Sequence, residues 1–214
     1  MAIYLSSDWH LIKCQYGRKP EISEDYEMIL NRIKQMDVCD TLYFLGDLID
    51  DTVDLSGNMK ELIYKLGHEL ICASPRCYFI RGNNDVMSDE FYHEMGWNNV
   101  SFAEWVTNSK GEKILLSHTS VKIPDNHPEI YNIHGHIHRA GTDPDRIAYY
   151  HKCTQNINLC TADKREHRFT NLEDINLSEE IKRNTMWTRG VEKPGMSQLC
   201  QNMAEQVLEK KLYE

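Results

Sequence analysis

The sequence predicts an α/β protein in which two packed mixed β-sheets are flanked by helices, with a helical extension at the C-terminus. Strand-like apolar runs alternate with amphipathic helical patterns over residues 2–80, and this alternation favours a parallel sheet covered by helices. A hairpin pattern follows near residue 110, and a last helical pattern covers residues 197–213. The 214 residues are enough for one domain with a single large core.

The first part of the chain reads as three buried strands separated by two helices. The predicted strands cover residues 2–6, 41–45 and 77–80. Between the first two strands, apolar side chains spaced three or four residues apart predict a helix behind an N-cap at Ser23, ending near Asp37. The same spacing predicts a second helix over residues 59–70. In such sheets ligands bind beyond the carboxyl ends of the strands, so we expect the chemistry to lie there.

The pattern changes after a short helix that Ser88 caps and Gly96 closes. Residues 102–106 and 113–117 flank a turn and predict a hairpin. Further strands are expected at residues 131–134, 147–150 and 156–160. These strands predict a second sheet, richer in antiparallel pairs and packed against the first.

Composition restricts the partners and the compartment. The formal net charge of −9 lacks the positive field on which sequence-independent nucleic-acid binding depends. The apolar runs are too short to cross a membrane. Seven scattered cysteines without a CxxC pair favour reduced, buried thiols over a disulfide framework or a zinc knuckle. We therefore expect a cytoplasmic protein without a membrane or nucleic-acid partner.

Five short segments, DWH, GD, GNND, SH and GHIH, contain an unusual set of potential metal ligands. The side chains are Asp8, His10, Asp47, Asn83, His118, His136 and His138. Oxygen and nitrogen ligands without sulfur suit divalent manganese, iron, zinc or nickel. Seven ligands exceed the three or four that one zinc ion takes from a protein, which favours two ions. The neighbouring glycines allow tight turns where backbone approaches a crowded site.

The ordered motifs DWH, GDLID, GNND, LLSHTS and HGHIH resemble those of the calcineurin-like metallophosphoesterase superfamily. The resemblance covers residues 2 to about 175 and implies a four-layer α/β/β/α sandwich over residues 1–175, with 176–214 as an extension. It implies that one metal ion is held by Asp8, His10, Asp47 and His138. The other would be held by Asp47, Asn83, His118 and His136, so that Asp47 bridges the two.

The same resemblance implies the reaction. A hydroxide that bridges two divalent metal ions, with manganese preferred, would attack the phosphorus of a phosphate ester. The catalytic candidates are Asp47, His118 and Asn84. Most family phosphatases have a histidine where this chain has Asn84, and an amide cannot deliver a proton at neutral pH. The loss of such an acid slows esters with poor leaving groups by about 10²- to 10⁴-fold.

We therefore expect a small phosphodiester as the substrate. The alternatives are a phosphomonoesterase or nucleotide phosphatase, and a binding scaffold that keeps the fold without turnover. Candidates for contact with a small phosphate ester are Lys13, Arg18, His127 and Arg139, and the plainer alternative for each is a solvated side chain. Asp85 either braces a ligand loop or is solvated at the surface.

The extension has its own helical pattern. Its apolar positions are Leu199, Met203, Val207 and Leu212. This stripe predicts packing against the domain, with a contact between two copies of the chain as the alternative.

Overall fold

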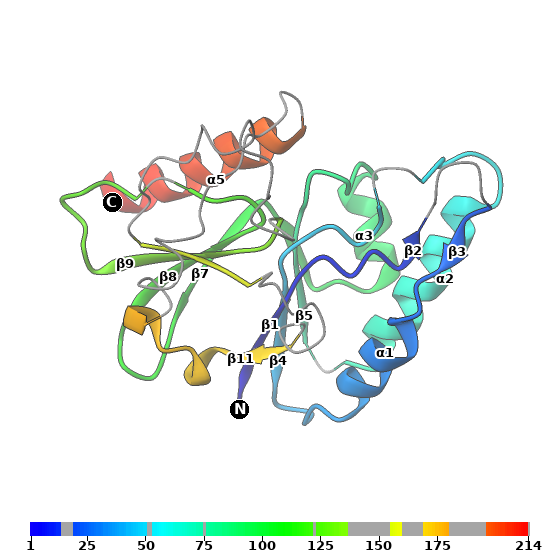
Figure 1. Cartoon of the computed structure of the whole chain (residues 1–214), viewed down its shortest axis with the longest axis horizontal. Coiled ribbons are helices and arrows are strands. Elements are labelled where there is room, and N and C mark those ends of the chain that lie inside the picture. Colours follow the sequence, from blue (N-terminus) through cyan, green and yellow to red (C-terminus); the bar gives the residue numbers. More distant parts are fainter. Residues whose placement is uncertain are drawn as a thin grey trace.

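The computed structural model describes residues 1–13, 19–50, 53–74, 76–121, 123–136, 155–159, 169–179 and 196–213. Within these residues the chain forms two main sheets (Figure 1). The first sheet has the strand order β11-β1-β4-β5-β6. Its strands are β1 (Ile3–Ser6), β4 (Thr41–Phe44), β5 (Cys77–Ile80), β6 (Asn99–Ser101) and β11 (Thr170–Asn171). The pairs β1-β4, β4-β5 and β5-β6 are parallel, and β11 is antiparallel to β1.

The second sheet has the strand order β10-β9-β8-β7. Its strands are β7 (Ala103–Thr107), β8 (Lys113–Ser117), β9 (Ile130–His134) and β10 (Asn156–Asn158). The predicted hairpin is the antiparallel pair β7-β8, but β8-β9 and β9-β10 are parallel. The expected excess of antiparallel pairs is therefore not found among the described strands. A small antiparallel ribbon joins β2 (Ile12–Lys13) to β3 (Glu21–Ile22).

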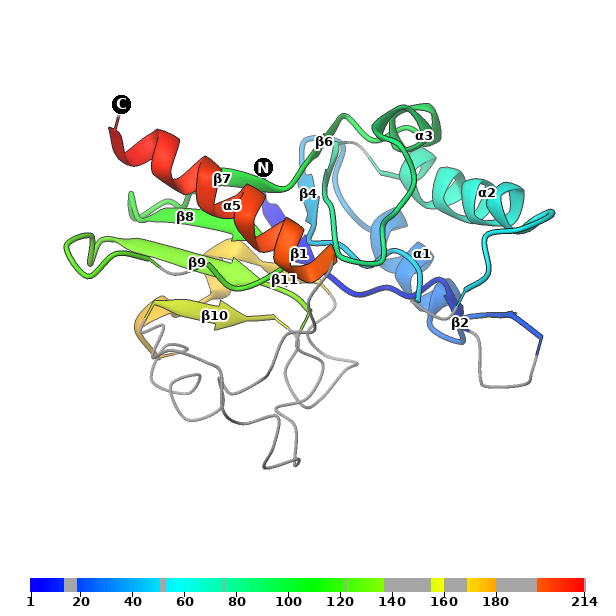
Figure 2. The ribbon, with the colours of Figure 1, turned by 90° about the horizontal axis from the view of Figure 1, so that it is seen from above.

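The helices lie on the two outer faces of the paired sheets. They are α1 (Tyr26–Lys34), α2 (Met59–Cys72), α3 (Asp89–Met95) and α5 (Met196–Tyr213), and a 3-10 turn, η2, covers Leu172–Asp174. Figures 1 and 2 show α1, α2 and α3 beside the first sheet and α5 across the second. The prediction of two mixed sheets flanked by helices, with a helix in the C-terminal extension, is confirmed. Among the described residues, the helix that covers the second sheet is α5, which belongs to the predicted extension rather than to residues 1–175.

Most local predictions agree with these elements, and the exceptions have local reasons. Ser88 accepts a hydrogen bond from the backbone N–H of Phe91, and Gly96 closes α3 with a φ of 118°, as predicted. The N-cap of α1 is Asp25 rather than Ser23. Ser23 lies two residues before that cap, and its hydroxyl accepts the Asp25 N–H at 3.4 Å. β6 was not predicted because its three residues contain a single apolar side chain. The strand predicted at 147–150 lies outside the described residues.

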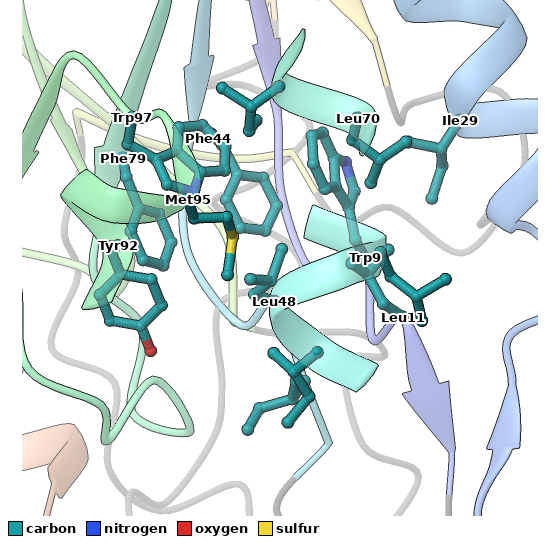
Figure 3. Packing of buried hydrophobic residues seen from close by; sticks show 14 of the residues in the cluster. Trp9, Leu11, Ile29, Phe44, Leu48, Leu70, Phe79, Tyr92, Met95 and Trp97 are labelled. Carbon is teal, nitrogen blue, oxygen red and sulfur yellow. The ribbon is translucent and has the colours of Figure 1, made fainter. Parts of the chain in front are cut away.

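Three apolar clusters separate the layers. The largest lies between the first sheet and helices α1, α2 and α3, and it includes Trp9, whose ring centroid is 4.2 Å from that of Phe44 (Figure 3). A second cluster joins the facing sides of the two sheets, with Leu5 from one and Leu116 from the other. The third lies under α5 and includes Leu115, because successive residues of β8 point to opposite faces.

The fully buried positions of α5 lie one residue further along the chain than the predicted apolar stripe. Cys200, Ala204 and Leu208 are buried, whereas Leu199 is 43% exposed. Of the predicted apolar positions, Val207 and Leu212 are partly buried and pack against the same cluster as Ala204 and Leu208. The predicted packing of α5 against the domain is confirmed.

Two further expectations from composition are tested by the described residues. Of the four described cysteines, Cys77 and Cys200 are buried, whereas Cys39 and Cys72 are exposed. The prediction of buried thiols is therefore confirmed for two of the four and wrong for the other two. None of the helices within the described ranges is both long and apolar enough to span a membrane.

The packing of α5 predicts a stability difference between two leucines on the same helix. We expect Leu208→Ala to lower the free energy of unfolding by about 2–5 kcal/mol, because it leaves a cavity in a buried cluster. The matched control, Leu199→Ala, should change it by less than about 0.5 kcal/mol, because that side chain is largely exposed. Urea unfolding of both variants measures the difference, and equal losses would contradict the packing of α5.

Candidate metal centre

The two sheets bring the ends of five strands to one place. Asp8 follows β1, Asp47 follows β4 and Asn83 follows β5, all in the first sheet. His118 follows β8 and His136 follows β9 in the second sheet, where Ser117 pairs with His134 in parallel register. Because these pairs are parallel, the carboxyl ends of neighbouring strands meet, and the predicted ligands converge across the two sheets.

The converging side chains form two groups that share one carboxylate. One group is Asp8, His10 and Asp47, and the other is Asp47, His118 and His136. Within each group the candidate ligand atoms all lie within 4.8 Å of one another. Asp47 is 2% exposed and belongs to both groups, which is the arrangement a bridging ligand needs.

The second group has the spacing of a single coordination sphere. His118 Nε2 lies 3.0 Å from Asn83 Oδ1, 3.1 Å from His136 Nδ1 and 3.4 Å from Asp47 Oδ1. Two atoms that each lie about 2.1 Å from one ion are about 3.0 Å apart at a right angle and about 3.4 Å apart at a tetrahedral angle. Asn83 therefore joins this group, and the donor set fits a divalent metal ion.

Backbone carbonyls select the ligand nitrogen of two histidines. His118 Nδ1 donates to the carbonyl of Leu45 at 2.7 Å, which directs Nε2 toward the group. His10 Nδ1 lies 3.1 Å from the carbonyl of Ile49, and a bond there presents Nε2 in the same way. A metal-binding histidine commonly uses one ring nitrogen for such a bond, which fixes the tautomer and the ring orientation.

The backbone is strained at four of the candidate ligands. The φ angles of Asp8, His10, Asp47 and His136 are 55°, 43°, 58° and 69°, in the left-handed region. This conformation costs a residue with a side chain about 1–2 kcal/mol. Such strain persists where the surrounding structure fixes the backbone, and it concentrates at functional sites.

Two glycines allow the loops to approach as closely as they do. A Cβ atom on Gly82 would overlap Asp47 Oδ1, and one on Gly135 would lie 2.6 Å from Asp8 Oδ2. Neither contact is possible for real atoms, so any side chain at these positions would displace a candidate ligand. The predicted role of glycine beside a crowded site is confirmed at both positions.

Asp47 and His118 form a buried ion pair. Burial raises the pKa of Asp47, but the charge of His118 and a hydrogen bond to it outweigh burial and lower the pKa overall. For His118, burial lowers the pKa, and the Asp47 carboxylate outweighs it and raises the pKa to about 10. Burial, and then the charge of His118, lowers the pKa of His136 to about 4. Without a metal ion, the proton on His118 balances the Asp47 charge.

Asn84 contacts the shared carboxylate. Its backbone N–H donates to Asp47 Oδ1 at 3.0 Å, and its side-chain amide donates to Asp47 Oδ2 at 2.9 Å. Its side-chain oxygen accepts a hydrogen bond from Asn83 Nδ2 at 2.7 Å. Because the Asn83 amide nitrogen is held in this way, the Asn83 oxygen faces His118. Asn84 therefore orients two candidate ligands.

Two of the four residues predicted to contact the substrate are described, and each of them pairs with an acidic side chain. Lys13 lies on β2 and pairs with Asp25 at 3.7 Å. His127 pairs with Glu129 at 3.2 Å and precedes β9, whereas the candidate ligands follow β9. A five-residue strand rises by about 13 Å from its first to its last residue, so the structure does not bring His127 to the site. Arg18, Arg139 and the predicted ligand His138 lie outside the described residues.

The clearest addition to the predicted site is Asp85. Its side chain is completely buried, so the alternative of a solvated surface residue is wrong. Burial, followed by the charge of Asp47, raises the pKa of Asp85, and backbone N–H donors oppose the rise. In the sequence, only its place directly after Asn84 indicates a role, and that place does not say which groups it contacts.

The fold and the site together define an α/β protein whose candidate metal ligands, carboxylate, amide and imidazole groups, gather at the strand ends. The sequence profile of the calcineurin-like phosphoesterase family matches residues 1–193, so the chain belongs to that family. It is therefore a metal-dependent phosphoesterase, as the motifs predicted.

Two of the solved structures that match this chain do so at low sequence identity. AQ665 of Aquifex aeolicus, a protein of unknown function, has a TM-score of 0.49 at 19% identity, and the match covers 86% of this chain and 98% of AQ665. The phosphoesterase YfcE of E. coli has a TM-score of 0.44 at 17% identity, covering 64% of this chain and 70% of its own. No curated protein is significantly similar to the chain in sequence.

The ion pair predicts how the stability of the metal-free chain depends on pH. The pKa of His118 is about 10 in the folded chain and 6.5 when unperturbed, so the pair stabilises the fold fully below pH 6.5. This contribution is lost as the pH rises through about 10. When a chelator keeps the chain free of metal, Tm of the wild type should fall between pH 6.5 and about 10, and His118→Gln should make this fall smaller. Parallel curves for variant and wild type would contradict the pairing.

Proposed function

We propose that this phosphoesterase hydrolyses small phosphodiesters with two divalent metal ions, manganese being preferred. The observation that carries the proposal is Asn84, which stands beside the shared carboxylate where most family phosphatases have a histidine. The sharing of Asp47 between two ligand groups supports two ions rather than one. Oxygen and nitrogen donors without sulfur support manganese, with iron, zinc and nickel as the alternatives.

Charge supports a diester over a monoester. A phosphate monoester carries nearly two negative charges at neutral pH, whereas a diester carries one. A histidine at position 84 could add a positive charge beside the phosphate, but an amide cannot. Two basic side chains near the motifs are engaged elsewhere: Lys13 pairs with Asp25, and Arg81 pairs with Asp89 at 2.7 Å. Neither of these two side chains is therefore free to pair with the second negative charge of a monoester.

The chemistry also depends on the leaving group. Bound divalent ions would lower the pKa of water and neutralise charge on the phosphate oxygens. One side-chain N–H of Asn84 is used by Asp47, and its second N–H would donate to a phosphate oxygen, but the amide has no proton to give to a departing alkoxide. Substrates whose leaving group needs little protonation, such as activated diesters, are therefore favoured.

The protein residues have distinct roles in this proposal. Asp47 would bridge the two ions, with Asp8 and His10 on one side and Asn83, His118 and His136 on the other. His138 would complete the first group, as the sequence motif suggests. Arg18 and Arg139 remain candidates for contact with the second ester group. The buried surroundings of Asp47 and His118 strengthen every charge interaction at the site, because water that would screen it is displaced.

The proposal predicts a substrate preference that depends on residue 84. With Mn²⁺, the wild-type chain should hydrolyse an activated aryl phosphodiester with a higher kcat/KM than the matching monoester. Asn84→His should raise kcat/KM for the monoester by about tenfold or more, because it restores a general acid and a positive charge. Chromogenic assays with both esters measure the two effects.

The outcomes separate the alternatives. Asn84→Asp, of similar size but with neither an amide donor nor a positive charge, serves as the control and should not gain monoester activity. A wild-type preference for the monoester would favour a phosphomonoesterase or nucleotide phosphatase. A chain that binds no divalent ion tightly and hydrolyses neither ester would favour a binding scaffold.

The shared carboxylate predicts unequal effects on metal stoichiometry. Asp47→Asn should weaken both sites for Mn²⁺, because an amide bridges two cations poorly. His10→Ala should weaken mainly one site, because His10 belongs to one group. Calorimetric titration of the metal-free chains with Mn²⁺ counts the sites. Loss of the same single site in both variants would argue against bridging by Asp47.

A further inference from the structure

Asp47 and Asn83 lie on separate loops, yet both must meet His118. Asp47 follows β4, and Asn83 follows β5, the neighbouring parallel strand. Strand pairing ends before these residues, because the last paired residues are Phe44 and Phe79. The distance between the two loops is therefore set by contacts beyond the sheet.

The side chain of Asp85 supplies those contacts. Its Oδ2 accepts the backbone N–H of Asp47 and that of Gly82, both at 2.7 Å, and its Oδ1 accepts the N–H of Leu48 at 2.9 Å. Two of these donors belong to the loop after β4, and the third belongs to the loop after β5. One carboxylate thus ties the two loops together directly beside Asp47 and Asn83.

Asp85 is itself fixed from the other side. The guanidinium of Arg81 donates to the backbone carbonyl of Asp85 at 2.7 Å and to that of Met87 at 2.6 Å. The same guanidinium pairs with Asp89, and its carbon lies 5.5 Å from the ring centroid of Phe102. The turn that carries Asp85 is therefore held to β5 by a side chain that is itself well packed.

We infer that Asp85 is a positioning residue that fixes the separation of the two ligand loops and thereby sets the affinity of the site for metal ions. Both of its oxygens are used by backbone donors, so it acts through Asp47 and Asn83 rather than as a ligand. A carboxylate suits this role because it accepts several hydrogen bonds without donating any. The inference rests on the metal site of the proposed function.

The test compares two buried aspartates that each accept backbone N–H groups. Asp40 is 5% exposed, accepts the N–H of Ala2 at 2.7 Å and that of Asp37 at 3.0 Å, and precedes β4 at the end far from Asp47. Asp85→Asn and Asp40→Asn each place an amide N–H₂ against a backbone donor, so both should lower Tm. Only Asp85→Asn should weaken Mn²⁺ binding, by about 10- to 100-fold in Kd.

Calorimetric titration of the folded, metal-free chains with Mn²⁺ gives the Kd values without any assay of activity. Should Asp85→Asn fold too poorly, Arg81→Gln removes the support behind Asp85 and should weaken Mn²⁺ binding in the same direction, by a smaller factor. The inference alone would be overturned if Asp85→Asn and Arg81→Gln both bound Mn²⁺ as tightly as the wild type. It would also be overturned if Asp85→Asn and Asp40→Asn lost equal Mn²⁺ affinity. A wild-type chain that binds no Mn²⁺ would overturn the metal site and the inference together.

Discussion

The structure depends on a buried carboxylate, Asp47, being held where two sheets meet. A buried charge is unfavourable unless other groups compensate it, and here the imidazole of His118 and the amide groups of Asn84 do so. These two partners come from separate segments, one after β8 in the second sheet and one after β5 in the first, so Asp47 is compensated only when both sheets are assembled. The same carboxylate belongs to both groups of candidate metal ligands, which links the integrity of the fold to that of the site.

The strain at the ligands is balanced by the packing behind them. Trp9 lies between Asp8 and His10, two residues with positive φ, and its side chain is completely buried against Phe44 and Trp97. Burial of a large aromatic side chain is worth more than the strain of one left-handed residue. The loop is thus anchored from one side, while its ligands point to the other.

Asp85 and Asn84 divide the support of the site between them. Asp85 ties backbone to backbone, whereas Asn84 contacts the side chains of Asp47 and Asn83. A change at Asp85 therefore alters the distance between loops, and a change at Asn84 alters the direction of ligand atoms and the charge near the substrate. These are separate ways in which one short segment, GNND, controls the same centre.

The sequence by itself determined the alternation of strands and helices, the family, and the residues that converge at the strand ends. These follow from local periodicity and from short motifs, which neighbouring residues specify. Only the tertiary structure decided the parallel pairing of β8 with β9, the face of α5 that is buried, and the positions of His127 and Asp85. Each depends on groups far apart in the chain. The sequence does not show at which end of a strand a loop histidine such as His127 will lie. It also does not show which backbone groups a turn aspartate such as Asp85 will contact.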